Sequence, residues 1–230
     1  MGGVIGAMST KFVVHAGMLL LSARVDGHSL QAALDPSSPR TIISVELAKR
    51  IGLPPKEIES VQISHGWVIG IDHYELRLGT VRVAAHPGAA PVIIGADILA
   101  HAPLLLDFER HRLSLIERSN RGLLQGDQLS RITDGMTPLQ LKVSSEGCFS
   151  VTGQDLNWRP ISVGWKGTSG TSYVEAPRVQ VHFGMISLPV EGPSKLDARC
   201  GFGAIIGWES FNHRRIVFDL PHHTLWLGLS

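Results

Sequence analysis

Hydrophobic and polar residues alternate over much of this chain in short runs that Gly, Pro, Asn and Asp interrupt, a pattern typical of β-strands joined by tight turns. The apolar run at residues 17–21 lies where the first strand is expected. Residues 25–35 then read as a strand, a turn at Asp26-Gly27, and a second strand that ends in Asp35. A helix is expected at residues 44–51, because a Gly and a Pro follow it closely. The pattern therefore predicts a mostly β protein with short helices.

The hydrophobic pattern also repeats at a constant spacing. Ile93-Ile94-Gly95 recurs as Ile205-Ile206-Gly207, and Leu106-Asp107-Phe108 recurs as Phe218-Asp219-Leu220, in both cases 112 positions later (207 − 95 and 219 − 107). Each copy is expected to run from a buried strand, through a short helical turn at 96–102 or 208–214, into a hairpin of alternating apolar residues. The repeat predicts two homologous lobes.

The segment around Asp35 carries a family resemblance. Asp35 is followed by Pro36, Ser37 and Ser38, and further on by Glu46-Leu47-Ala48-Lys49-Arg50-Ile51-Gly52-Leu53. This arrangement resembles the aspartic peptidases of the retropepsin and pepsin type, in which a hairpin delivers Asp-Thr-Gly-Ala, a helix often written E-L-A-x-x-L-G-L follows, and an apolar-apolar-Gly strand comes later. The resemblance covers about residues 12–116 well and about 139–229 less well. It implies two acid-protease-like β-barrel lobes with a central cleft, where each lobe supplies one catalytic Asp.

The second lobe departs from that family at the catalytic position. Aligning Tyr173-Val174 with Ile42-Ile43 places Lys166 opposite Asp35 (166 − 35 and 174 − 43 both give 131), and the motif continues as Gly167, Thr168 and Ser169. The family's two carboxylates share a proton and hold the attacking water. A lysine in place of one of them holds the remaining carboxylate ionised and removes the protonated carboxyl that polarises the substrate carbonyl.

The first lobe departs as well. Pro36 and Ser37 stand where the family has Thr and Gly, so the hydroxyl that braces the paired loops is missing, as is the glycine that lets the backbone approach the catalytic water. We therefore expect a catalytically impaired, aspartic-peptidase-like pseudoenzyme that binds a peptide or protein segment in the interlobe cleft.

An active aspartic endopeptidase stays open as the alternative. In one form, Lys166 acts as electrophile or proton donor beside Asp35. In another, an unrecognised carboxylate such as Asp155 or Asp197 faces Asp35. A third form, in which the chain completes its pair of aspartates by dimerising through lobe one, is disfavoured because lobe two already occupies the partner's place.

The stretch between the motif and the Ile-Ile-Gly strand is shorter in lobe two, at 41 positions (207 − 166) against 60 in lobe one (95 − 35). The missing part is expected to be mainly the helix and the hairpin. In the family this hairpin is the flap over the cleft, and here it is expected at residues 61–83, with candidate turns at Ser64-His65-Gly66 and at residues 70–73. Trp67 and Tyr74 are candidate flap aromatics that stack on a bound chain. His65 and Gly66 are further candidates for substrate binding in the flap. Equally, each aromatic could cover the edge of its own lobe's core.

These patterns divide the chain into an N-terminal tail (1–11), lobe one (12–116), an interlobe linker (117–138) and lobe two (139–230). The linker is polar and punctuated by Gly. Part of it is expected to pack against a lobe through its apolar residues Leu123, Leu124, Leu129 and Ile132.

Composition restricts the partners. The 230 residues are 43% hydrophobic with 25 Gly and 13 Pro, which suffices for one large core or two small ones. A formal net charge of +1 and scattered Arg and Lys argue against nucleic acid as a partner. The run at 17–21 is far too short to span a bilayer, so no membrane span is expected.

No metal and no cofactor are expected, because the 11 His residues lack ligand spacing and His222-His223 falls in a hairpin turn. Cys148 and Cys200 could form a disulfide or remain as thiols. Residues 1–11 show no secretory signal, which leaves the localisation open between the cytoplasm and export with a signal removed. The oligomeric state is equally open.

Overall fold

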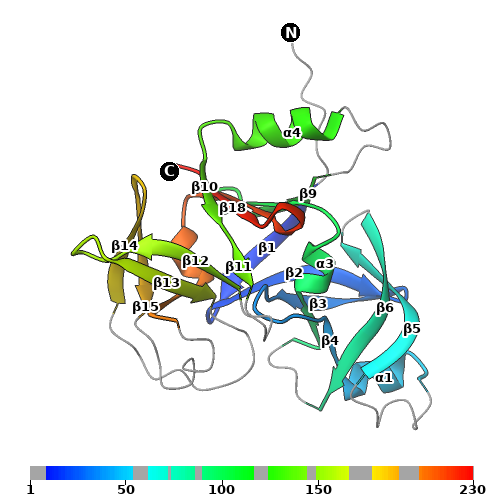
Figure 1. Ribbon diagram of the computed structural model, residues 1–230. Coiled ribbons are helices and arrows are strands. Elements are labelled where there is room, and N and C mark those ends of the chain that lie inside the picture. Colours follow the sequence, from blue (N-terminus) through cyan, green and yellow to red (C-terminus); the bar gives the residue numbers. More distant parts are fainter. Residues whose placement is uncertain are drawn as a thin grey trace.

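The computed structural model describes residues 9–53, 62–71, 74–85, 90–116, 124–143, 149–165, 178–191 and 202–229. Strands dominate these residues and the helices are few and short, as the sequence predicts. The strands form one twelve-stranded and one six-stranded sheet. We call residues 9–116 the first half and residues 124–229 the second half. In Figure 1 the first half extends to the right and the strands β12 to β15 of the second half lie on the left.

The first half opens with an antiparallel meander of β1 (Thr10–His15), β2 (Met18–Val25) and β3 (His28–Leu34). The Asp26-Gly27 turn between β2 and β3 is confirmed, with φ of 45° and 82°. The apolar run at residues 17–21 lies in a strand from Met18 onward, as expected, but this strand is the second of the chain because β1 precedes it. Gly17 lies in a turn with a φ of 76°, and the residues that follow it belong to β2.

The chain then passes through β4 (Ile42–Ser44), α1 (Val45–Arg50), β5 (Gln62–Ile71), β6 (Tyr74–Ala84), β7 (Val92–Ile94) and α3 (Ala96–Leu99). The helix expected at 44–51 is thus confirmed as α1, and the Ser44 side chain caps it by accepting a hydrogen bond from Leu47 N at 3.1 Å. β3 runs parallel to β7, β7 runs antiparallel to β4, and β4 runs parallel to β6. This order brings the end of β3 beside the end of β7.

A central sheet joins the two halves. It contains β8 (Leu104–Asp107), β9 (Arg112–Leu115), β10 (Thr137–Gln140), β17 (Arg215–Asp219) and β18 (Thr224–Leu227), in the order β10-β18-β17-β8-β9-β1. In the contact between β8 and β17, Leu105 pairs with Val217, the residue 112 positions later. Leu106 pairs with Ile216 and Leu104 pairs with Phe218 on either side. Adding 112 to each residue of β8 turns one of these two pairs into the other, because Leu106 corresponds to Phe218 and Leu104 to Ile216. A pseudo-two-fold axis therefore passes through the pair of Leu105 and Val217.

The second half repeats much of this plan in a smaller sheet. It has β11 (Lys142–Val143), β12 (Phe149–Gln154), β13 (Pro160–Trp165), β14 (Arg178–Phe183), β15 (Ile186–Glu191) and β16 (Ala204–Ile206), with short helices η2 (Trp208–Phe211) and η3 (Leu220–His222). β13 runs parallel to β16, as β3 does to β7.

The expectation that lobe two lacks the hairpin is wrong. The hairpin of β14 and β15 closes on the pair Phe183 and Ile186, which matches the pair Ile71 and Tyr74 of β5 and β6 at the offset of 112. Only 17 positions separate Lys166 from Phe183 (183 − 166), whereas 36 separate Asp35 from Ile71 (71 − 35). The shorter stretch therefore precedes the hairpin, in the part of the repeat where the first half has α1.

One large hydrophobic core runs through both halves. Phe108 of the first half contacts Trp208 and Phe211 of the second, at ring-centroid distances of 6.2 and 5.8 Å. The second half is rich in aromatic rings at positions where the first half has Leu34, Ala96, Leu99 and Leu106; the rings belong to Trp165, Trp208, Phe211 and Phe218. Large rings help the shorter second half to fill its interior.

The segment expected to be a linker contains a helix, α4 (Leu124–Thr133), which lies beside the central sheet in Figure 1. Its residues Leu129 and Ile132 pack against Ile116, Met136 and Val217, as expected for two of the four apolar residues. The helix therefore covers the sheet at the pseudo-two-fold axis.

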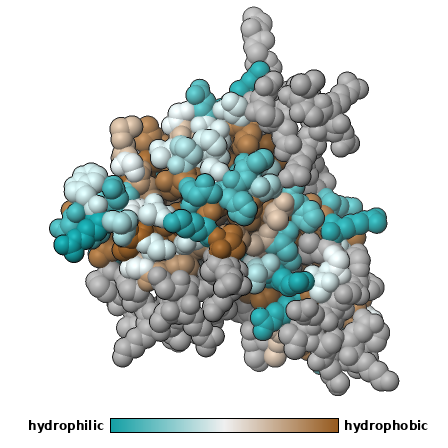
Figure 2. Space-filling model, viewed as in Figure 1, coloured by the Kyte–Doolittle hydropathy of each residue, from teal (hydrophilic) through white to brown (hydrophobic). Residues whose placement is uncertain are grey.

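On the face in Figure 2, hydrophobic and hydrophilic residues are intermingled. The most exposed large hydrophobic residues, Met185, Leu156 and Trp158, belong to hairpin turns of the second half. Among the described residues, no helix is long and apolar enough to cross a membrane.

Candidate functional site

Asp35 lies directly after β3 and is almost completely buried, with 2% of its surface exposed. Its backbone N donates a hydrogen bond to Ile94 O at 2.9 Å, which fixes it beside β7. Its carboxylate oxygen Oδ1 accepts two hydrogen bonds from Ser37, from the backbone N at 2.9 Å and from Oγ at 2.5 Å. Ser38 N donates to Asp35 O at 3.1 Å and closes the turn.

Pro36 and Ser37, which stand where the resembled family has Thr and Gly, shape this turn. Pro36 is buried, restricts φ and has no N–H or hydroxyl to donate. Ser37 keeps a backbone donor to the carboxylate and adds a hydroxyl donor to the same oxygen. Charge-assisted hydrogen bonds of this kind are among the stronger ones, so Oδ1 is firmly engaged within its own turn.

Thr41 and Asp97 brace the loop behind Asp35. Thr41 is fully buried, and its Oγ1 donates to Asp97 Oδ1 at 2.7 Å while it accepts from Gly95 N at 3.1 Å. Thr41 N donates to Asp97 Oδ2 at 2.8 Å. A Cβ on Gly95 would lie 2.5 Å from Arg40 C and 2.8 Å from Ser38 O, so the two loops are in close backbone contact.

Our sequence reasoning missed this bracing pair, although the repeat carries a signal for it. Asp97 follows Gly95 by two positions, and Glu209 follows Gly207 by two positions. An acidic residue at the same place in both copies indicates a shared structural role. In the second half, Glu209 lies in the first turn of η2, and its Oε2 is 2.7 Å from where a Cβ of Gly207 would lie.

The second motif residues, Lys166, Gly167, Thr168 and Ser169, lie outside the described residues. The strand that leads to them is described. Trp165 of β13 pairs with Ile206, as Leu34 of β3 pairs with Ile94, so the strand register follows the alignment that sets residue 166 against residue 35. That Lys166 faces Asp35 stays a prediction.

The two carboxylates named as alternative partners differ in what the structure says of them. Asp155 lies in the turn between β12 and β13, at the opposite end of β13 from Trp165, and its Oδ1 accepts from Asn157 N at 2.8 Å and Arg159 N at 2.9 Å. Asp155 is therefore a turn residue and does not face Asp35. Asp197 lies outside the described residues.

The flap candidates fall on the hairpin of β5 and β6. The expected turn at Ser64-His65-Gly66 is wrong, because these residues belong to β5, at an irregularity in its register between Ser64 and Trp67. The strands instead close at Ile71 and Tyr74, in agreement with the second candidate turn. Trp67 is completely buried, which favours its role in the core over a role in stacking on a ligand. The side chains of His65 and Tyr74 and the surroundings of Gly66 lie outside what the structure describes.

The remaining candidates concern metal and cysteine chemistry. His222 Nδ1 lies 2.8 Å from the Asp219 carboxylate, within the turn where the sequence placed it. In the described part of the chain, no three His, Cys, Asp or Glu residues gather in a way that could hold a metal ion. Cys148 and Cys200 lie outside that part.

No protein-family model and no curated protein sequence matches this chain. Among solved structures, the chain is similar to conglutin gamma, a basic 7S globulin from lupine seeds, with 7% identity over 97% of this chain and 95% of that one and a TM-score of 0.54. It is also similar to the retroviral protease-like domain of Ddi1 from Leishmania major, with 17% identity over 45% of this chain and 92% of that one and a TM-score of 0.36. At such identities, the likeness to conglutin gamma concerns the fold, which the two chains share over nearly their whole lengths.

Proposed function

We propose that this chain is an aspartic-peptidase-like protein without effective peptidase chemistry, which binds a peptide or protein segment in the cleft between its halves. The observation that carries the proposal is the setting of Asp35. The carboxylate is buried at the end of β3, and Oδ1 is engaged by both donors of Ser37.

Aspartic peptidase chemistry needs one carboxylate that takes a proton from water and one carboxyl that donates a proton to the scissile carbonyl. The alignment places Lys166 where the second carboxyl belongs, and a lysine beside Asp35 favours the ionised carboxylate. Loss of one positioned acid or base typically lowers the rate by about a hundredfold to ten-thousandfold. Together with the engaged Oδ1, this substitution argues for binding without turnover.

The unequal hairpins support a binding role. Within the described ranges, β5 and β6 have 10 and 11 residues, whereas β14 and β15 have 6 each. In the resembled family the longer hairpin is the flap that covers a bound chain. One long hairpin suits a cleft that holds an extended segment from one side.

The activity test uses the intact protein with an unfolded protein substrate at acidic and at neutral pH. We expect no pepstatin-sensitive cleavage, and the same result for Asp35→Asn. Lys166→Asp restores two carboxylates but keeps Ser37, so at most slight activity is expected. Robust cleavage by the unmodified protein that disappears in Asp35→Asn would refute the proposal and identify an active enzyme.

Binding is tested separately by amide hydrogen exchange. A mixture of peptides from the digested substrate is expected to slow exchange in β5 and β6 of the intact protein. Exchange in β12 and β13, at the turn around Asp155, serves as the internal control and should not change. Unchanged exchange in β5 and β6 at saturating peptide concentration would contradict the proposed cleft binding.

A further inference from the structure

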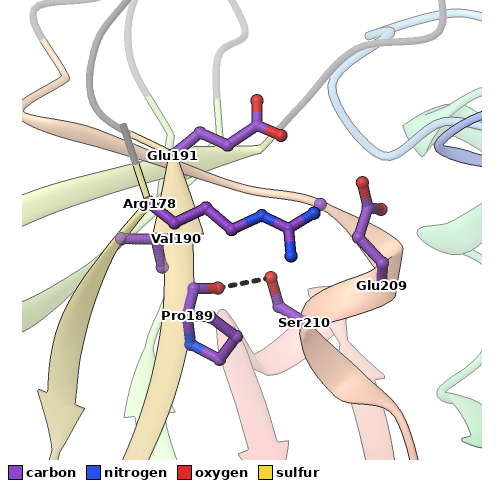
Figure 3. A pocket seen from close by; sticks show the side chains of 7 residues that line it. Arg178, Pro189, Val190, Glu191, Glu209 and Ser210 are labelled. Carbon is purple, nitrogen blue, oxygen red and sulfur yellow. Dashed lines mark hydrogen bonds between the residues drawn. The ribbon is translucent and has the colours of Figure 1, made fainter. Parts of the chain in front are cut away.

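Two depressions of different size occur in the two halves. The one in the first half has a volume of about 560 Å³ and is lined by residues that include Arg40, Arg77, Gly79, Asp97 and His101. The one in the second half has a volume of only about 20 Å³, and Figure 3 shows Arg178, Pro189, Glu191, Glu209 and Ser210 around it.

These depressions occupy equivalent places in the repeat. Arg77 pairs with Val68 across the first hairpin, as Pro189 pairs with Gln180 across the second. At the same offset of 112, Gly79 corresponds to Glu191 (191 − 79) and Asp97 to Glu209 (209 − 97). The two halves therefore show how one site looks when it is filled and when it is open.

In the second half the chain fills the site with its own charged groups. The Arg178 side chain extends across the pocket towards Glu209, and Glu191 projects from the neighbouring strand (Figure 3). Ser210 Oγ donates a hydrogen bond to Pro189 O at 2.6 Å and closes the lower side. One cation and two carboxylates thus line a nearly closed space.

The depression of the first half contains two arginines, Arg40 and Arg77, and lacks a carboxylate at the position that matches Glu191. Its arginines are not the counterpart of Arg178, which corresponds at the same offset to Gly66 (178 − 112). Arg40, Arg77 and His101 are exposed, and within the described ranges none of them forms an ion pair. Asp97 accepts hydrogen bonds from Thr41 N, Thr41 Oγ1 and Ile98 N, so its carboxylate is already committed to the loop. The open depression therefore carries an excess of positive charge.

The position equivalent to Glu191 is empty space. A Cβ built on Gly79 meets no atom within 4 Å, and Gly79 is exposed on the depression. The second half thus places a carboxylate-bearing side chain where the first half has a glycine and room.

We propose that the depression of the first half binds a carboxylate of a partner peptide, an acidic side chain or a C-terminus, seated over Gly79 and held by Arg40 and Arg77. Guanidinium groups bind carboxylates through paired charge-assisted hydrogen bonds, which gives both strength and orientation. A carboxylate is favoured over a phosphate because the repeat itself supplies a glutamate at this place. Neither Asp35 nor residue 166 lines this depression, so its carboxylate binding can be tested separately from the function proposed for Asp35.

The test measures binding of a fluorescein-labelled tetraglutamate peptide with blocked termini to the full chain by fluorescence anisotropy. Gly79→Glu supplies the carboxylate from the chain itself and is expected to weaken binding about tenfold or more, whereas the uncharged Gly79→Gln should weaken it less. Arg77→Gln should also weaken binding about tenfold or more. The matched control, Arg82→Gln, removes an exposed arginine of the same strand outside the depression and should change binding by less than about threefold.

Competitors distinguish the source of the charge. Glutarate is expected to displace the peptide, and tetraglutamine is not. No binding by the unmodified protein, or equal binding by Gly79→Glu and the unmodified protein, overturns the proposal. Displacement by inorganic phosphate at lower concentration than by glutarate overturns the choice of carboxylate. Glutarate binding as tight as that of tetraglutamate overturns the choice of a peptide as the partner.

Discussion

Thr41 shows how one buried hydroxyl orders the surroundings of Asp35. The Thr41 side chain has no exposed surface, and its Oγ1 donates to Asp97 while accepting from Gly95 N. A single hydroxyl thus joins the loop after Asp35 to the turn after β7. A buried polar group that loses its partner costs more free energy than the bond itself contributes, so this contact is sensitive to substitution.

Thr41→Val tests the role of this hydroxyl without a change of shape. The variant leaves Gly95 N without its partner and removes one of the two hydrogen bonds to Asp97 Oδ1, which still accepts from Ile98 N. We expect the free energy of unfolding to fall by about 1–3 kcal/mol. Urea denaturation followed by tryptophan fluorescence measures the change. Thr41→Ser keeps the hydroxyl and is the control, with a smaller expected loss. Equal losses in the two variants would show that the methyl group, not the hydrogen bonds, accounts for the effect.

Among the elements, the close contact between the end of β7 and the loop at residues 38–40 depends on one glycine. A Cβ on Gly95 would meet backbone atoms of Arg40 and Ser38, which cannot turn aside as a flexible side chain can. Gly79, in β6, offers the opposite case, because a Cβ there meets nothing within 4 Å.

Gly95→Ala is therefore expected to lower the free energy of unfolding by about 1–3 kcal/mol, the usual range for an overpacked site. Gly79→Ala is the matched control and should leave stability unchanged or raise it slightly, since glycine in a strand costs about 0.5–1 kcal/mol relative to alanine. Thermal denaturation of both variants checks the pair. A Gly95→Ala variant as stable as the unmodified protein would contradict the close packing of the two loops.

At the scale of elements, the sequence predicts those turns, helices and hairpins that depend on residues close together in the chain. The Asp26-Gly27 turn, the helix α1 and the two hairpins of the central sheet follow from turn residues and from the alternation of apolar residues. The total length of the segment does not reveal the hairpin of β14 and β15, because it does not show which part of the segment is shortened. The sequence predicts a turn where β5 has a bulge, because a glycine such as Gly66 is typical of both turns and bulges.

The candidate site shows the same division. Asp35 directly follows β3, as the sequence predicts, because the apolar residues of the hairpin strand stop at Leu34. The role of Ser37 was read as a loss of glycine, whereas its hydroxyl and N–H both bind Asp35 Oδ1. The burial of Trp67 could not be predicted either, because it depends on strands that are distant in sequence.

In the molecule as a whole, the two halves are joined through the pairing of β8 with β17. Because this pairing is symmetric, each half could in principle form it with a second copy of the same half. Leu105 of β8 pairs with Val217 of β17, and the neighbouring pairs are related by the pseudo-two-fold axis. β17 therefore occupies the edge of β8 that a second copy of the first half would need. This explains why the intact chain has no room for dimerisation through β8.

A fragment of residues 9–116 lacks β17 and therefore leaves that edge of β8 free. Without β17, β8 presents an unpaired edge whose register is self-complementary, with Leu105 opposite Leu105 of the second copy and Leu104 opposite Leu106. We expect the fragment to form a two-fold dimer, whereas the intact chain shows no association through this strand. Sedimentation velocity at micromolar concentrations distinguishes the two. Leu105→Lys in the fragment puts like charges face to face at the axis and should yield a monomer. A monomeric unmodified fragment would show that the joint between β8 and β17 needs side chains specific to the second half, of which Phe218 and Val217 are the first to examine. A dimer that survives Leu105→Lys would show that the fragment associates through a surface other than the edge of β8.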